Sequence, residues 1–367
     1  MSAIPTGHLA PSSGSVGWPG VVEAFRPELP LPEGARAVTL REGNTPLVAA
    51  EVLGEGTDLN LKLESLNPTG SFKDRGMTVA VTGAIAKGAR ALICASTGNT
   101  AASAAAYAAR AGVPCAVLLP AGNVALGKLA QARVAGAVPV AVEGSFDTAL
   151  GLVRHWVGEH PEAALVNSVN PLRLEGQKTA AFEVVSQLGD APDALVLPVG
   201  NAGNISAYYR GFVRAVERGW ATHVPRLYGI QAQGAAPMVF GHEVEEPETV
   251  ATAIRIGRPV SAGLARTAAA ESGGGFLAVS DEEILAAHRD LPRKTGVFVE
   301  PASAASLAGF RRLRETGQIR PGERVVLVLT GNGLKDVDTA LRSVLEPIRA
   351  VAADPAALNR LLGEVLW

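Results

Sequence analysis

From about Ala91 onward, short apolar runs alternate with longer alanine-rich stretches of helical character. Regular alternation of strands and helices predicts an α/β fold in which a parallel sheet is covered by helices on both faces. Right-handed crossovers then place the loops that follow the strands along one edge of the sheet, where ligands bind. The expected buried strands are Ala91–Ala95, Cys115–Leu119, Val138–Val142, Leu165–Val166, Ala194–Leu197, Arg226–Ile230 and Val325–Leu329, and the expected helices are Ala101–Ala111, Gly127–Ala135, Ser145–Val157 and Glu175–Leu188.

The length and charge of the chain narrow the class of protein. Its 367 residues suggest two domains, or one large α/β unit with an insertion. The 33 basic and 35 acidic residues leave a net charge of −2. This balance argues against nucleic acid or an anionic membrane as a partner. No uninterrupted apolar stretch of about 20 residues, as a membrane helix needs, is present. The two cysteines, Cys94 and Cys115, cannot form a disulfide framework, so we expect a reducing, cytoplasmic location.

The two ends of the chain differ from the middle. Residues 1–32 are rich in Pro, Gly and Ser, and we expect an arm lying on the surface, without the basic start and apolar core of a signal peptide. The last residues, Asp354–Trp367, have an amphipathic helical pattern that suits packing or a dimer contact.

Lys73 lies in the segment Pro68–Gly76, on a glycine-bounded turn after an alternating strand, Leu59–Glu64, and before a helix expected to begin near Met77. A lysine amine is protonated at neutral pH, so it becomes a nucleophile only when it is desolvated or covalently engaged. A Schiff base with pyridoxal phosphate would meet that need. From this segment alone, a surface lysine that caps the turn is about equally favoured.

Two loops at strand–helix junctions have the composition of anion sites. The run Ala95–Thr100 places small polar residues before an alanine-rich helix, which favours a carboxylate- or phosphate-binding loop over simple capping by about two to one. In Pro198–Ile205, closely spaced glycines allow successive N–H groups to converge on a phosphate. The run Gly122–Lys128 approaches a P-loop, but Leu129 stands where the magnesium-binding hydroxyl is required.

A fourth segment, Thr330–Asp336, follows an expected strand, and its threonine could bond a ligand's ring nitrogen or close the turn. The chain has no H-E-x-x-H, no cysteine pair spaced for zinc and no G-x-S-x-G. We therefore expect no metal site, and chemistry that comes from lysine, hydroxyls, amides and a cofactor.

These four segments, in this order, resemble the pyridoxal phosphate enzymes of fold type II, the tryptophan synthase β family. Further matches narrow the resemblance to the threonine synthase family, and it runs from about Trp18 to Ala340. One departure lies at Arg258–Ala262, where that family usually has Asn-Pro and an aromatic residue. The added matches are Trp18–Pro30, Arg41–Leu47, Ser168–Thr179 and Ala251–Gly257, of which the last two are the most discriminating.

The resemblance implies roles for individual residues. It makes Lys73 the Schiff-base and catalytic lysine, Asn99 the partner of the cofactor's ring hydroxyl oxygen, and Thr330 the hydroxyl that faces the ring nitrogen. The implied cradle for the cofactor phosphate is Gly200, Asn201, Ala202, Gly203 and Asn204. We expect the substrate to be bound by Ser96, Thr97, Thr100, Ser168, Arg173 and Asn201.

Arg173 is expected to bind the phosphate of the substrate, because its planar guanidinium suits two phosphate oxygens at once. A structural ion pair between Arg173 and Glu175 or another carboxylate is the alternative. Lys178 is the next candidate for the phosphate.

The resemblance also implies an architecture and a reaction. We expect two doubly wound, largely parallel sheet domains with the cofactor in the cleft between them: residues 33–90 and 175–367 form a large cofactor-binding domain, and residues 91–174 a smaller mobile one. The implied reaction converts O-phospho-L-homoserine and water into L-threonine and phosphate, the last step of threonine biosynthesis, in a homodimer. A threonine or serine dehydratase of the same fold, and a non-catalytic protein that binds a phosphorylated ligand, are the alternatives.

Overall fold

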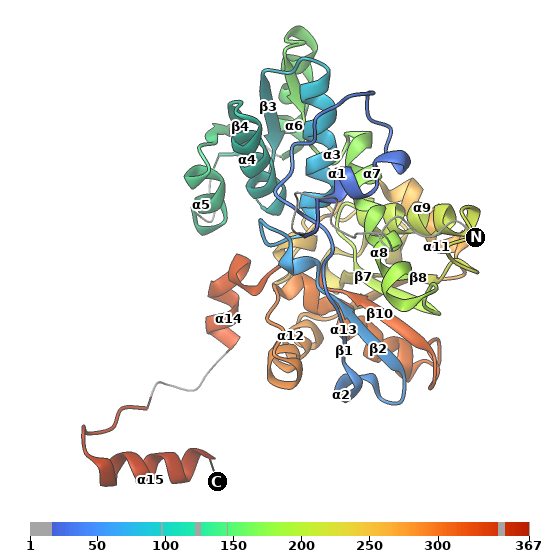
Figure 1. Cartoon of the computed structure of the whole chain (residues 1–367). Coiled ribbons are helices and arrows are strands. Elements are labelled where there is room, and N and C mark those ends of the chain that lie inside the picture. The colour runs from blue at the N-terminus through green and yellow to red at the C-terminus, as the bar shows by residue number, and fades with distance from the viewer. Residues whose placement is uncertain (1–16, 97, 122–125, 145, 344–348, 367) are drawn as a thin grey trace. The chain divides into compact units, whose positions relative to one another are not determined.

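The computed structural model describes residues 17–96, 98–121, 126–144, 146–343 and 349–366. Residues 1–336 form one compact unit and residues 337–367 a second (Figure 1). The strands of the first unit make two sheets, one at each end of the unit, and helices surround both. The expected α/β architecture with largely parallel sheets is confirmed.

The larger sheet has six strands, and only its edge strand β1 runs antiparallel to its neighbour. The smaller sheet has four strands, all parallel. In spatial order, the larger sheet consists of β1 (Leu47–Ala49), β2 (Asp58–Lys62), β10 (Arg324–Val328), β7 (Ala194–Pro198), β8 (Arg226–Ala232) and β9 (Gly275–Val279), and the smaller one of β5 (Val138–Val142), β4 (Cys115–Pro120), β3 (Ala91–Ala95) and β6 (Ala163–Leu165).

The helices of the first unit include the crossovers that connect its parallel strands. In the first unit they are α1 (Val21–Ala24), α2 (Glu51–Gly54), α3 (Lys73–Ala86), α4 (Asn99–Ala111), α5 (Leu126–Val134), α6 (Phe146–Glu159), α7 (Pro171–Gln177), α8 (Thr179–Leu188), α9 (Gly203–Glu217), α10 (Pro237–Phe240), α11 (Ala262–Glu271), α12 (Asp281–Thr295) and α13 (Pro301–Glu315), with short 3₁₀ turns η2 (Arg26–Glu28), η3 (Glu64–Leu66), η4 (Gln233–Ala235), η5 (Thr252–Ile254) and η6 (Gly333–Asp336).

Both faces of the central strands are buried, because successive side chains of a strand point to opposite faces. In β10, Val325 and Leu327 join one hydrophobic core, while Val326 and Val328 join the core on the other face. In β3, Leu92 packs in a third core. That third core also includes Met77, Ala80, Val81 and Ala84 of α3, so this helix packs on the smaller sheet although it precedes the first of its strands.

Two expectations about local structure are wrong, and the N-terminal arm is partly buried. Val138–Val142 forms β5, but it is an exposed edge strand rather than a buried one, with Val138 60% exposed. The stretch Glu175–Leu188 is divided between α7 and α8, which meet at Lys178. The described part of the arm, residues 17–32, buries Val21, Val22 and Phe25 completely, because they pack against α8 and its neighbours in the second core. Residues 1–16 lie outside the described part.

The second unit contains α14 (Val337–Ser343) and α15 (Pro355–Leu366). The C-terminal helix α15 falls within the stretch where the amphipathic pattern predicts one, and none of its residues is buried. Among the described residues, no helix is long and apolar enough to cross a membrane.

Candidate active site

The candidate site is a cleft of about 780 Å³ in the first unit, lined by loops that follow strands of both sheets. From the smaller sheet come residues after β3, β4 and β6; from the larger sheet come residues after β7 and β10. These loops lie at the carboxyl ends of parallel strands, where ligands bind in open α/β sheets. All the expected site residues that the structure describes line the cleft, except Arg173. Thr97 lies outside the described residues.

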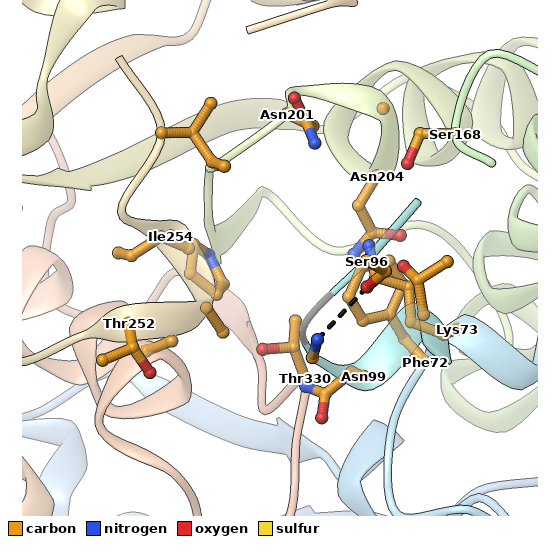
Figure 2. A pocket seen from close by; sticks show the side chains of 18 of the residues that line it. Phe72, Lys73, Ser96, Asn99, Ser168, Asn201, Asn204, Thr252, Ile254 and Thr330 are labelled. Atoms are coloured by element: carbon orange, nitrogen blue, oxygen red, sulfur yellow. Dashed lines mark hydrogen bonds between the residues drawn. The ribbon is translucent and has the colours of Figure 1, made fainter. Parts of the chain in front are cut away.

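Lys73 is the first residue of α3, so the helix begins four residues earlier than the sequence pattern predicts. The turn before it is fixed to the loop after β10: Ser71 forms a β-bridge with Gly331, and the Phe72 N–H donates to the Thr330 carbonyl at 3.0 Å. These contacts place Lys73 in the cleft beside Thr330 (Figure 2).

The electrostatic environment of Lys73 suits a nucleophile. Burial, aided by the positive charge of Arg173 and opposed by Glu300, lowers the pKa of Lys73 from 10.5 to about 7. An ammonium with such a pKa releases its proton near neutrality, so a large fraction of the amine is neutral and able to attack a carbonyl. From its own segment of sequence, Lys73 could equally have been a surface lysine that caps a turn. Its position in the cleft removes that alternative.

The loop Gly200–Asn204 forms a cradle at the start of α9, and the free N–H groups at a helix N-terminus are suited to bind an anion. Ala202 has a left-handed backbone with φ of 64°, which is uncommon for a residue with a side chain and typical of functional loops. A Cβ at Gly200 would lie 3.1 Å from Ile254 Cα, so the cradle is tightly covered on that side. The buried Asn204 Nδ2 has no hydrogen-bond partner among the described residues. A phosphate dianion fits this set of donors.

Asn99 and Thr330 lie in the cleft near Lys73 (Figure 2). Asn99 begins α4, and its Nδ2 donates to the Glu300 carboxylate at 3.1 Å. Thr330 Oγ1 is 2.9 Å from Ser303 Oγ, and that serine hydroxyl also accepts from the Gly331 N–H at 2.7 Å. An amide and a hydroxyl held in this way are suited to bond the polar atoms of a flat ring.

Arg173 does not line the cleft but is fully buried beside it in α7. A Cβ at Gly76 would lie 2.8 Å from Arg173 Nε, so the guanidinium packs against α3 within one turn of Lys73. Its Nη1 donates to the Val166 carbonyl at 2.8 Å, while Nε and Nη2 have no partner among the described residues. Buried N–H groups of a cation rarely remain unpaired, and these two donors are of the kind that suits an anion.

The alternative partner of Arg173, Glu175, is engaged elsewhere. Glu175 forms ion pairs with Lys178 at 2.5 Å and with Arg210 at 3.5 Å. The structure therefore does not contain the ion pair between Arg173 and Glu175 that was the alternative to phosphate binding, and Lys178 is held by Glu175.

Sequence reasoning gave no role to several residues of the cleft. Glu300 precedes Pro301 at the start of α13, and nothing in its local pattern distinguishes it from an ordinary helix start. Lys335 donates to Gln131 of α5 at 2.5 Å, and both line the cleft. The segment Thr252–Ile256 lies over the phosphate cradle. It belongs to the family motif Ala251–Gly257, and that motif was the feature of the sequence from which its role could have been predicted.

Comparisons with known proteins agree with this geometry. The family described as "Pyridoxal-phosphate dependent enzyme" matches residues 38–331. The threonine synthase of Mycobacterium tuberculosis (strain ATCC 25618 / H37Rv) is 56% identical over 348 residues, which cover 94% of this chain and 96% of that protein. The threonine synthase of Methanocaldococcus jannaschii is 50% identical over 349 residues, covering 92% and 86%.

Solved structures share the fold. The threonine deaminase of T.th. superposes with a TM-score of 0.65 at 28% identity, covering 79% of this chain and 92% of that one. O-ureido-L-serine synthase gives a TM-score of 0.72 at 18% identity over 88% and 99% of the two chains, a likeness that concerns the fold alone.

Proposed function

The chain belongs to the family of pyridoxal-phosphate dependent enzymes and, within it, to the threonine synthases, and on this premise we propose that the cleft converts O-phospho-L-homoserine and water into L-threonine and phosphate. The observation that carries the choice of substrate is Arg173, whose Nε and Nη2 have no partner among the described residues and whose Nε packs against Gly76, three residues after Lys73. A cofactor phosphate and a substrate phosphate require two such anion sites.

The cofactor fits the residues present. The N–H groups of Gly200–Asn204 and the unpaired Asn204 amide would hold its phosphate, Asn99 its ring hydroxyl oxygen, and Thr330 its ring nitrogen. Pyridoxal phosphate, when bound, supplies an aldehyde that an amine can bond and a ring that accepts the electrons left when a proton is removed.

Lys73 then has two tasks in this proposal. Its amine holds the cofactor until the substrate amine takes its place. Once free, the same amine removes the proton from the substrate Cα, releases it within the cleft and then removes one from Cβ, and it returns a proton at Cγ after the phosphate has left. Water then adds its hydroxyl at Cβ and gives its proton to the departed phosphate, and a proton returned at Cα completes L-threonine. A pKa of about 7 suits both giving and taking a proton near neutrality.

Arg173 holds the departing phosphate in this proposal, with Ser168, Thr100 and Asn201 as further contacts from the cleft wall. Ser96, which lines the cleft, is a further substrate contact in this proposal, and Thr97 stays an expectation from the sequence. The guanidinium can place two N–H groups on two phosphate oxygens at once, which orients the bond that breaks.

A paired assay tests the reaction. We expect phosphate release from O-phospho-L-homoserine together with L-threonine, and little ketoacid from L-threonine. Ketoacid from threonine or serine, without phosphate release, would favour the dehydratase instead. A colourless protein that does not take up pyridoxal phosphate would favour the non-catalytic binding protein.

Replacing Arg173 by alanine should lower kcat/KM for O-phospho-L-homoserine about 30- to 1000-fold, because a charge-assisted contact to the phosphate is lost. Cofactor binding should remain, since the cradle is formed by other residues. Arg173→Lys should recover only part of the activity. Steady-state kinetics and the cofactor's visible absorption measure the two effects, and an Arg173→Ala enzyme with unchanged kcat/KM would show that another residue binds the phosphate.

Thr330→Asp should change the absorption spectrum of the bound cofactor and raise side products, such as those of transamination, relative to threonine. A carboxylate at this position would keep the ring nitrogen protonated and make the ring a stronger electron acceptor. Thr330→Ser, which keeps the hydroxyl, should behave like the wild type. If the spectrum and the product ratio of Thr330→Asp match those of the wild type, Thr330 does not face the ring.

We further propose that residues 91–174 move as a smaller domain against residues 33–90 and 175–367, and that the enzyme is a cytoplasmic homodimer. The separate four-stranded sheet formed by strands between residues 91 and 165 supports the first point. The family resemblance supports the homodimer. The buried free cysteines Cys94 and Cys115 suit a reducing compartment and so support the cytoplasm. Sedimentation analysis of the holoenzyme would measure the oligomeric state.

A further inference from the structure

Glu300 is a carboxylate of the cleft to which the proposed function gives no role. It stands at the N-cap of α13, only 6% exposed, and accepts from Asn99 Nδ2 at 3.1 and 3.3 Å through its two oxygens. The two residues are 201 positions apart in sequence and lie on helices associated with different sheets. A hydrogen bond between two residues so far apart in sequence forms only where the fold holds the Glu300 carboxylate in place.

The surroundings of Glu300 provide that hold. Its N–H donates to the Gly331 carbonyl at 3.1 Å, and its own carbonyl accepts from the Ser303 N–H at 2.9 Å. A Cβ at Gly331 would lie 2.2 Å from Glu300 Oε1, so only glycine leaves room for the carboxylate. The N-terminus of α13 also favours a negative charge at this point.

The chemistry of the pair fixes the orientation of the Asn99 side chain. An ionised carboxylate only accepts hydrogen bonds, so the nitrogen end of the amide must face Glu300. Turning the amide over would place its oxygen against the carboxylate oxygens. The amide nitrogen carries two hydrogens, and with one of them on Glu300 the other remains for a second acceptor.

We propose that Glu300 is a positioning residue that locks the amide of Asn99, so that Asn99 presents an N–H and not its oxygen to the hydroxyl oxygen of the cofactor ring. This inference rests on the role proposed above for Asn99. Glu300 then affects cofactor binding only through Asn99, so its effect should disappear when Asn99 is replaced.

A double-mutant cycle on cofactor affinity tests the proposal without substrate. Glu300→Met keeps the length of the side chain but removes the acceptor, and we expect the dissociation constant for pyridoxal phosphate to rise about 10- to 100-fold. Asn99→Ala should weaken binding to a similar degree. Adding Glu300→Met to Asn99→Ala should then change the dissociation constant less than about twofold, because coupled residues are not additive.

Glu246→Met, at an exposed glutamate, is the matched control and should bind the cofactor like the wild type. An equal loss of affinity from Glu300→Met with and without Asn99 would overturn the proposal and indicate a direct effect, for example through the charge that Glu300 exerts on Lys73. Unchanged affinity in Glu300→Met would overturn it as well.

An exchange variant separates positioning from a merely structural role and does not depend on the folding of Glu300→Met. N99D/E300Q retains a carboxylate–amide pair but presents oxygen to the ring. We expect a thermal midpoint of the cofactor-free protein close to that of the wild type, together with weak cofactor binding and a shifted absorption band. Wild-type affinity in this variant would show that the orientation of residue 99 is irrelevant. Since no readout uses O-phospho-L-homoserine, failure of the proposed reaction would be seen separately.

Discussion

Replacing Lys73 by alanine should leave a folded protein whose turnover of O-phospho-L-homoserine falls at least about 1,000-fold, because one side chain both holds the cofactor and moves the protons. Folding should survive, since Lys73 is the first residue of α3 and alanine is a good helix former. Turnover, the visible absorption of the bound cofactor and its shift on borohydride treatment are the measurements. All three should be lost together.

Lys87→Ala is the matched control, because Lys87 is an exposed lysine at the end of the same helix. It should retain wild-type turnover and absorption. Lys335 also lines the cleft, although it is bonded to Gln131. Retained turnover in a Lys73→Ala preparation of verified mass would contradict the assignment of Lys73 and make Lys335→Ala the next variant to measure.

Replacing Glu183 by alanine should destabilise the protein by about 3–5 kcal/mol, the typical cost of leaving buried charges unpaired. Glu183 accepts from Arg75 Nη1 at 2.7 Å and from Lys62 Nζ at 2.9 Å, and all three side chains are at most 2% exposed. Arg75 also pairs with the buried Glu64 at 2.7 Å. Without Glu183 the cluster keeps two cations and a single carboxylate.

Urea unfolding measures this loss, with Glu217→Ala as the control. Glu217 pairs with Arg214 at 3.0 Å, but its side chain is 56% exposed, so its removal should cost less than about 1 kcal/mol. A similar, small loss in both variants would show that the buried cluster contributes no more than a surface pair.

The loss should also depend on pH. Burial alone would raise the pKa of Glu183, but the charges of Arg75 and Lys62 outweigh burial and lower it from 4.5 to about 2. A carboxyl whose pKa is lowered by folding stabilises the folded state fully at pH values above its pKa in the unfolded state. It loses that contribution as the pH falls toward its pKa in the folded state. The difference between wild type and Glu183→Ala should therefore shrink between about pH 4.5 and pH 2.

The cluster also bears on catalysis, because Arg75 follows Lys73 by two residues in α3. A Cβ at Gly176 would lie 2.0 Å from the Arg75 carbonyl, so α7 approaches the start of α3 as closely as glycine allows. The ion pairs and this contact hold the first turn of α3, and with it the position of Lys73.

What the sequence determined by itself follows from short-range patterns. Apolar runs and alanine-rich stretches encode burial over a few residues, and they were enough to predict a parallel α/β fold and to place most strands of both sheets within two residues of their bounds. Strands β1 and β9, which lie at the two edges of the larger sheet, were missed. Lys73, Asn99 and Thr330, which line the cleft, were singled out because each lies in a motif whose spacing is local.

The tertiary structure alone decided which distant side chains meet. Glu300 faces Asn99 across 201 positions, Glu183 pairs with Lys62 across 121, and Arg173 lies against Gly76 rather than beside Glu175. The exposure of β5 depends on its place at the edge of a sheet, which its apolar sequence does not encode. Periodicity records how deeply a residue is buried, whereas the partner of a buried charge depends on how whole helices pack, and no local pattern contains that information.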